Sequence, residues 1–360
     1  MEKAQGFHEV LLYRPRSTEY ENLRSWYIAN CVFNVFLTIT TILSNGITIQ
    51  ALRRTSSLPQ PLRTLLLSLA VSDLGVGLLG EPFYLGILVT WLQQEITTGA
   101  SFTAFRFIFY LFVTASFSGV MALTVDRFLA VYLHLRYQEL VTHKRVVAVV
   151  ISIWVFSAFL SLLNLWVPKN ISYIMFAITG IVWLIVSVMC YLKIYFTVRR
   201  HRNEIQVLQV QQVAQNDQIA NADRLRKSAV GIFYVYLVFL FCYLPQFCNF
   251  AVVAIFNLSA GVKAFSISSI TLLLLNSSLN PVIYCWKMRH IRRAVMDILR
   301  NVLPIHSWVN TSYSSFSLLC VLTGGISFFH QNWLEKRDHE QKCCLTLWCM
   351  CPRGWWWWMS

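Results

Sequence analysis

Charge is scarce in this sequence. Of its 360 residues only 13% are Asp, Glu, Lys or Arg and 56% are hydrophobic, whereas soluble domains carry about 25% charged residues. Acidic residues are the scarcer sign, 16 against 30 Lys and Arg, which leaves a formal net charge of +14. A nucleic-acid-binding protein would gather its basic residues on a soluble face, but here they alternate with long apolar runs. The composition therefore excludes an ordinary soluble domain, argues against a nucleic-acid partner and predicts a protein that crosses a membrane several times.

Other features are missing as well. Of the ten cysteines, six lie in or beside apolar runs and four cluster near the C-terminus, so we expect no extracellular disulfide. The first ten residues lack the short apolar core of a signal peptide, and the first membrane helix is expected to direct its own insertion. No nucleophile–base pair or paired carboxylates converge at one depth, so we expect no enzyme. The alternative class, a transporter or channel, would favour internal repeats or pore-lining charge, and the sequence has no repeat.

Seven apolar runs are present, each near the 20 or so helical residues that cross about 30 Å of hydrocarbon. Lys and Arg gather in the first, third and fifth connections and after the seventh run, while the opposite connections hold little beyond Lys169 and Lys263. The positive-inside rule then places the N-terminus outside the cell, and it places the sequons at Asn170 and Asn257 in outer loops, where they can be glycosylated. The predicted fold is an all-α, seven-transmembrane helix bundle in the plasma membrane, with spans at 28–52, 62–89, 101–132, 146–167, 172–197, 229–256 and 262–284.

The chain divides into four parts. We expect an extracellular N-terminus over 1–27, the bundle over 28–284 and a cytoplasmic tail over 301–360 that is disordered or mispredicted, with an eighth span as the alternative. The part between them, 285–300, has basic residues on one face, so we expect an amphipathic helix on the anionic inner leaflet. Its apolar face consists of Met288, Ile291, Val295, Ile298 and Leu299.

Polar residues stand at specific places inside the spans. Asp73 lies in the second span, and an isolated acid there costs about 2.5–3.5 kcal/mol on insertion scales, so it is expected to be functional. The third span ends in Asp126-Arg127. The seventh span holds Asn276-Ser277-Ser278-Leu279-Asn280-Pro281-Val282-Ile283-Tyr284. Because amide and hydroxyl groups at membrane depth need hydrogen-bond partners, this stretch should face a polar interior.

In this order, one set per helix, these residues resemble the class A (rhodopsin-like) G-protein-coupled receptors over about residues 28–300. The resemblance implies a receptor that binds an extracellular ligand and activates heterotrimeric G proteins by nucleotide exchange, with arrestin as a further partner. The positions that carry it are Asn45, Asp73, Asp126-Arg127, Trp154, Pro245 and Asn280-Pro281-x-x-Tyr284.

The departures from the family pattern indicate a subgroup. Tyr243 replaces the tryptophan of the sixth helix, and Phe102 stands about where the third helix usually has a cysteine. The fifth helix lacks its proline, with Trp183 near that position, and the second outer loop is very short. These features resemble the melanocortin, lysophospholipid, cannabinoid and adenosine receptors, the melanocortin receptors most. Phe109 stands where amine receptors carry an aspartate, so an amine ligand is not expected.

The resemblance implies two inner sites. The first is an allosteric sodium pocket formed by Asp73, Ser116, Asn276 and Asn280, because hard cations prefer oxygen ligands; the alternative is a water-filled polar network. No other cofactor is expected.

The second site is a switch at the cytoplasmic end. Arg127 would pair with Asp126 at rest and turn toward Tyr191 and Tyr284 when the sixth helix moves outward; the alternative is a simple positive-inside anchor. Leu225 stands where an acid often locks the resting state, so we expect high basal activity. The residues assigned to coupling and activation are Asp126, Arg127, Tyr191, Tyr243, Pro245, Pro281 and Tyr284.

The ligand is expected in the extracellular half, among aromatic side chains that either contact it or only pack. Glu81, taken to lie at the mouth of the second helix, and Arg106 either pair with each other or hold a charged ligand. The candidate ligand contacts are Glu81, Phe102, Phe105, Arg106, Phe109, Phe112, Phe247 and Phe250.

Overall fold

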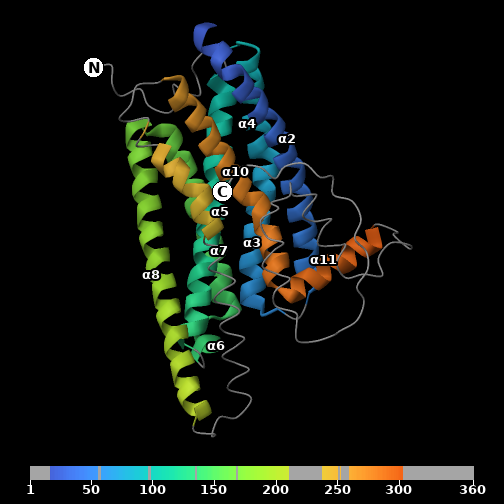
Figure 1. Ribbon diagram of the computed structural model, residues 1–360, viewed down its shortest axis with the longest axis vertical. Helices are drawn as coiled ribbons and strands as arrows, with labels where there is room; N and C mark the ends of the chain where they lie inside the picture. Colours follow the sequence, from blue (N-terminus) through green and yellow to red (C-terminus); the bar gives the residue numbers. More distant parts are fainter. Residues whose placement is uncertain are drawn as a thin grey trace, which may run out of the picture.

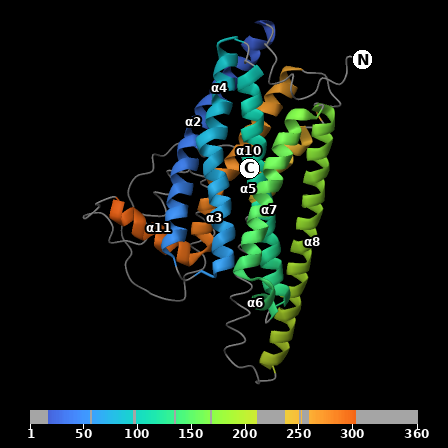
Figure 2. The ribbon, with the colours of Figure 1, turned by 180° about the vertical axis from the view of Figure 1, so that it is seen from behind.

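The computed structural model is an elongated bundle of helices (Figure 1). It describes residues 17–55, 58–95, 99–133, 136–167, 169–210, 237–249, 252 and 259–302, and every regular element within them is helical. Figure 2 shows the same bundle from behind, with α7 and α8 on one side and α2 and α11 on the other. The half of the bundle at the N-terminal ends of α2, α5 and α10 is called the upper half below, after its place in Figure 1.

Six helical segments are long and apolar enough to cross a membrane, and the shorter apolar helix Leu237–Asn249 lies inside the predicted sixth span. This confirms the expected all-α membrane bundle. In chain order the elements are α2 (Ser17–Arg54), α3 (Gln60–Gly75), the π-helical turn η1 (Val76–Gly80), α4 (Glu81–Leu92), α5 (Gly99–Leu133), α6 (Tyr137–Leu140), α7 (His143–Trp166), α8 (Lys169–Val210), α10 (Ala260–Lys287) and α11 (Arg289–Val302).

Helix α2 begins at Ser17, within the segment that was expected to precede the bundle. The distribution of polar and apolar side chains on this helix is the reverse of that on a helix of a soluble protein. Large apolar side chains are exposed on its outer face, where lipid tails can cover them. Its buried face repeats every three or four residues, and much of that face is polar. The buried polar residues are Asn30, Asn34, Thr41, Asn45 and Thr48.

The second membrane helix is interrupted by η1 between α3 and α4. Within it the backbone N–H of Glu81 donates to the carbonyl of Val76, five residues earlier. Pro82 follows at the start of α4 and has no N–H to give an α-helical bond. The structure thus has a wider turn directly before this proline.

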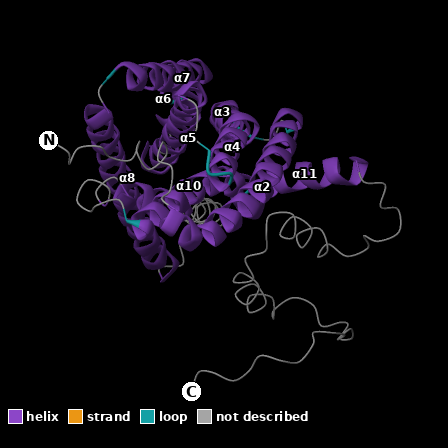
Figure 3. Ribbon diagram, turned by 90° about the horizontal axis from the view of Figure 1, so that it is seen from above, coloured by secondary structure: helices purple, strands orange, loops and turns teal. Residues whose placement is uncertain are grey.

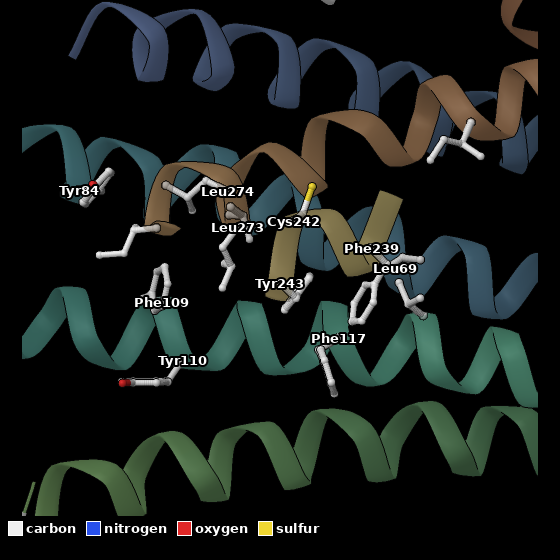
Figure 4. Packing of buried hydrophobic residues seen from close by; sticks show 14 of the residues in the cluster. Leu69, Tyr84, Phe109, Tyr110, Phe117, Phe239, Cys242, Tyr243, Leu273 and Leu274 are labelled. Carbon is white, nitrogen blue, oxygen red and sulfur yellow. The ribbon is translucent and has the colours of Figure 1, made fainter. Parts of the chain in front are cut away.

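Helix α5 occupies the middle of the bundle and packs against α3, α7 and α8. Its inward side chains join those of the neighbouring helices in one apolar core (Figure 4). Trp154 of α7 donates from Nε1 to Ser68 Oγ of α3 at 3.1 Å, which fixes α7 on the bundle although most of its outer face is exposed.

The connection between α7 and α8 is shorter than expected. Helix α7 ends at Trp166 and α8 begins at Lys169, so Asn170 lies in the first turn of α8 rather than in an outer loop. Helix α8 runs past the expected end of the fifth span to Val210, as the extension of a membrane helix would. The second sequon, Asn257, lies outside the described residues.

Helix α10 carries Pro281 in its interior and ends at Lys287. After a break at Met288, α11 runs sideways from the bundle (Figures 1 and 3). Its buried residues Ile291, Val295 and Ile298 share one face, which packs toward α2 and α10. The predicted amphipathic helix is thus present, two to four residues later than its predicted bounds.

Candidate functional site

Asp73 is the centre of the polar interior. Its side chain is fully buried at 0% exposure, and each carboxylate oxygen accepts a separate hydrogen bond. Ser116 Oγ of α5 donates to Oδ1 at 2.8 Å, and Asn280 Nδ2 of α10 donates to Oδ2 at 2.8 Å. Three helices that are far apart in the sequence therefore meet at one carboxyl group.

The surroundings of Asp73 retain unused hydrogen-bonding capacity. Asn45 Nδ2 of α2 donates to the carbonyl of Ser277 at 2.9 Å, so it fastens the polar stretch of α10 to α2. Asn276, which precedes Ser277 in α10, is also buried. Its Nδ2 and the buried hydroxyl of Tyr284 have no hydrogen-bond partner within the described part of the chain. Buried polar groups without protein partners are the groups that ordered water or an ion satisfies.

A second polar group lies at the lower end of α5. Arg127 Nη2 lies 2.7 Å from Asp126 Oδ2, and the hydroxyl of Tyr137 in α6 donates to Asp126 Oδ1 at 2.7 Å. Partial burial and the neighbouring Asp126 carboxylate raise the pKa of Tyr137, so its hydroxyl keeps the donated proton. The short helix α6 is thereby tied to the acid that holds Arg127.

The two tyrosines expected to receive Arg127 are both buried in the bundle. Tyr191 of α8 has its hydroxyl 3.4 Å from Thr124 Oγ1, on α5 above Asp126. Tyr284 belongs to α10.

Tyr243 lies in an aromatic cluster between the helix Leu237–Asn249 and α5 (Figure 4). Its ring stacks on Phe239 at a centroid distance of 4.2 Å and meets Phe117 of α5 at 5.2 Å. Phe117 also meets Trp183 of α8 at 6.4 Å. Tyr243, which replaces the tryptophan of the sixth helix, therefore contacts two neighbouring aromatic rings directly. Through Phe117, this cluster also contacts α8.

The aromatic candidates of the upper half divide into two sets. Phe105 of α5 contacts Phe109 and Tyr84, with ring centroids 5.2 and 5.9 Å apart, and Phe102 is buried one turn above. These rings form one column along α5.

Phe112 and Phe247 instead fill notches left by glycines. A Cβ at Gly75 would lie 2.2 Å from Phe112 Cε1, and one at Gly180 would lie 2.2 Å from Phe247 Cε1. Both rings are thus packed where a larger residue could not stand. Phe250 lies outside the described residues.

The expectation that Glu81 lies at the mouth of the bundle was wrong. Its side chain is 0% exposed, and Thr41 Oγ1 of α2 donates to its Oε1 at 3.0 Å. Arg106 lies on the other side of α5, where its Nη2 donates to the carbonyl and to the Oδ1 of Asn164 in α7. The physical reason is that Glu81 opens α4, which continues to Leu92, so the residue lies inside the membrane helix, and η1 sets the face to which its side chain points.

Sequence reasoning missed a set of polar contacts that hold the upper half of α10. Ser266 donates to Asn249 Oδ1 and Ser269 donates to Gln246 Oε1, both at 2.7 Å, which ties α10 to the helix that carries Tyr243. On the opposite side Thr271 donates to Asn30 Oδ1 at 3.0 Å. The repeat of Asn and Thr every three or four residues along α2 was a visible signal for the second of these contacts.

Comparison with known proteins identifies the family. A sequence model of the 7-transmembrane receptor (rhodopsin family) matches residues 44–171 and 164–284. This chain belongs to the rhodopsin family of seven-transmembrane receptors. It is therefore a G-protein-coupled receptor in the membrane, and the transporter or channel alternative is not favoured. Residues Asp73, Arg127 and Asn280 all fall inside the matched region.

Two of the relatives named here are similar over most of their length, and a third over about a third of its length. The adenosine receptor A2b of Gallus gallus is 23% identical over 311 residues, 76% of this chain and 88% of that receptor. The melanocortin receptor 3 of Rattus norvegicus is 23% identical over 273 residues, 73% and 83% of the two chains. The human olfactory receptor 51B5 is 34% identical over 119 residues, which is 33% of this chain and 37% of that receptor.

Proposed function

We propose that this receptor lies in the plasma membrane with its N-terminus outside and activates heterotrimeric G proteins when Arg127 is released at the cytoplasmic end of α5. The observation that carries the proposal is the contact of Arg127 with Asp126 at 2.7 Å, braced by Tyr137. A charge-assisted pair at the end of a membrane helix stabilises the conformation in which it forms. Loss of that pair would free Arg127 for Tyr191 and Tyr284 and open a site for a Gα subunit, and for arrestin after it.

Guanine nucleotide exchange in membranes tests this proposal. Asp126→Asn weakens the pair by about 1 kcal/mol, so basal exchange should rise about fivefold. Arg127→Ala should abolish exchange at unchanged surface expression. Equal exchange in the wild type and in both variants would contradict the switch.

The basal level is a separate point. Leu225 offers no carboxylate to lock the resting state, and it lies outside the described residues. We therefore expect the unliganded receptor to exceed mock-transfected cells in nucleotide exchange, and Leu225→Glu to lower that level. Output equal to that of mock-transfected cells would refute high basal activity.

The polar group around Asp73 supports an allosteric sodium site. Asp73, Ser116, Asn276 and Asn280 present the oxygen atoms that a hard monovalent cation prefers. A bound ion would neutralise the Asp73 carboxylate and favour the resting state. Titration of NaCl against agonist affinity should give a clear reduction in the wild type and none in Asp73→Asn; an unchanged sodium effect in the variant would exclude the site.

For the ligand, the aromatic column of Phe105, Phe109 and Tyr84 is the best supported contact surface. It gives large apolar rings and, at Phe109, no acid for an amine. Phe109→Ala should lower ligand potency at least tenfold, whereas Phe36→Ala, on the outer face of α2 with 63% exposure, should leave it unchanged. Unchanged potency in Phe109→Ala would remove this column from the ligand site.

A further inference from the structure

Glu81 is a second fully buried acid on the same membrane helix as Asp73. The two are eight residues apart, and in a regular α-helix eight residues turn about 80° past two full turns. The π-helical turn η1 takes up about one extra residue, so the offset falls to about 20° and both side chains point to one face. The turn therefore brings into the bundle a carboxyl group that a regular helix would point elsewhere.

The two carboxyl groups differ in their donors. Asp73 accepts from Ser116 on one oxygen and from Asn280 on the other. Glu81 accepts from Thr41 on Oε1, while Oε2 has no hydrogen-bond partner within the described part of the chain. An ionised carboxylate that is fully buried with one donor is strongly disfavoured, whereas a neutral acid can share one hydrogen bond with Thr41 in either direction.

No cation near Glu81 replaces the missing donor among the contacts that the structure defines. Asp73 on α3 adds a second negative charge on the same helix face. On α5, Arg106 is held by Asn164 of α7, and Lys263 lies in the first turn of α10. The remaining titratable side chains on the upper parts of the elements packed against η1 and α4 are Tyr20, Glu21, Arg24, Tyr27 and Cys31 of α2, Tyr84 of α4 and Tyr110 of α5.

Helix α2 also supplies polar side chains between Glu81 and the upper end of the bundle. Thr41 contacts the acid directly. Two turns above it, Asn34 Nδ2 donates to Thr271 Oγ1 at 3.1 Å, and Thr271 donates to Asn30 Oδ1. The buried Asn34 Oδ1 has no partner within the described residues. These groups line the α2–α10 interface with hydrogen-bonding sites. Together with water molecules, such sites would let a proton reach Glu81 from the upper end of the bundle.

We propose that Glu81, turned inward by η1 and bonded to Thr41, is a proton-binding site that is occupied in this conformation. The proton site follows from the geometry alone. Its effect on signalling rests on the proposed function, in which the Arg127–Asp126 pair marks the resting state. In the active state Oε2 would gain a donor or a water molecule and Glu81 would be ionised. The resting state then binds one more proton than the active state, so low pH favours the resting state. Rising pH removes the proton and favours activation, by at most about tenfold per pH unit for one group.

The first test is independent of G proteins. Infrared spectra of the purified full-length receptor in nanodiscs should show a protonated carboxyl band at neutral pH that is lost in Glu81→Gln and retained in Glu95→Gln, an exposed acid just after α4. Asp73→Asn identifies any contribution from the other acid. A band that is absent in the wild type, or that is unchanged in Glu81→Gln, would overturn the proposal.

The second test measures basal nucleotide exchange against pH with the same receptor and a purified G protein. Wild type and Glu95→Gln should rise together with pH, whereas Glu81→Gln, which stays neutral, should give a flat, low profile. Thr41→Val removes the donor to Oε1 and should shift the rise to higher pH. A pH profile of Glu81→Gln that matches the wild type would refute the coupling, while absence of exchange in every variant would refute the proposed function and leave the infrared result standing.

Discussion

Asp73 and Glu81 lie on one face of one membrane helix, and both are completely buried. They differ in what surrounds them: Asp73 meets a donor on each oxygen, from α5 and from α10, while Glu81 meets one hydroxyl from α2. Burial is therefore the same for the two acids, and the difference between them lies in the donors that the neighbouring helices supply. Because hydrogen bonds to an ionised carboxylate favour its charged form, we expect Asp73 to hold its charge more readily than Glu81.

A third acid extends the comparison. Asp126 is also buried, yet it has a cation beside it and a tyrosine hydroxyl on its other oxygen. One receptor thus contains an acid held by a cation, an acid held by neutral donors and an acid that we propose holds a proton. Each arrangement predicts a different response to substitution.

The largest effect is expected from Asp73→Ala. The change leaves Ser116 Oγ and Asn280 Nδ2 as buried groups without their acceptor, at about 1–3 kcal/mol each. We expect a total loss of about 2–6 kcal/mol, against a smaller loss for Glu81→Leu, which leaves a single hydroxyl that can bond to its own helix. Thermal unfolding of both purified variants measures the difference. A greater loss in Glu81→Leu would reverse the comparison.

A more selective change removes one donor from each acid. Ser116→Val would give Asp73 one donor, as Glu81 has, and should cost about 1–3 kcal/mol. Thr41→Val should cost less than about 1 kcal/mol, because a neutral Glu81 loses only one hydrogen bond between uncharged groups.

Unfolding at several pH values separates the two cases. The loss in Ser116→Val should be greatest where Asp73 is ionised, and so should shrink as pH falls. Equal losses in both variants at all pH values would mean that the two acids do not differ in charge.

Much of the Asp73 site could be predicted from the sequence, because the resemblance to the class A receptors implied that Asp73, Ser116 and Asn280 share one pocket. Glu81 could not be placed in this way. A sequence read with 3.6 residues per turn puts it on a different face, and only the backbone bond from Glu81 to the Val76 carbonyl shows the wider turn. The contact of Arg106 with Asn164 could not be predicted from the sequence either, because Asn164 lies in another helix, 58 residues away in the chain. By contrast, the polar face of α2 was open to prediction from the spacing of Asn30, Asn34, Thr41 and Asn45.

A modest effect is expected at Asp126, the acid that has a cation beside it. Tyr137→Phe removes one hydrogen bond to Asp126 but leaves Arg127 in place, so the resting state should lose about 0.5–1.5 kcal/mol and basal nucleotide exchange should rise a few-fold. Because the pKa of Tyr137 is raised above its ordinary value, the wild-type hydroxyl stays protonated and the bond persists through neutral and mildly basic pH. The ratio of variant to wild-type exchange should therefore be constant from about pH 6 to 9 when measured on the Glu81→Gln background. A ratio that changes with pH there would show that the hydrogen bond from Tyr137 to Asp126 does not persist over this range.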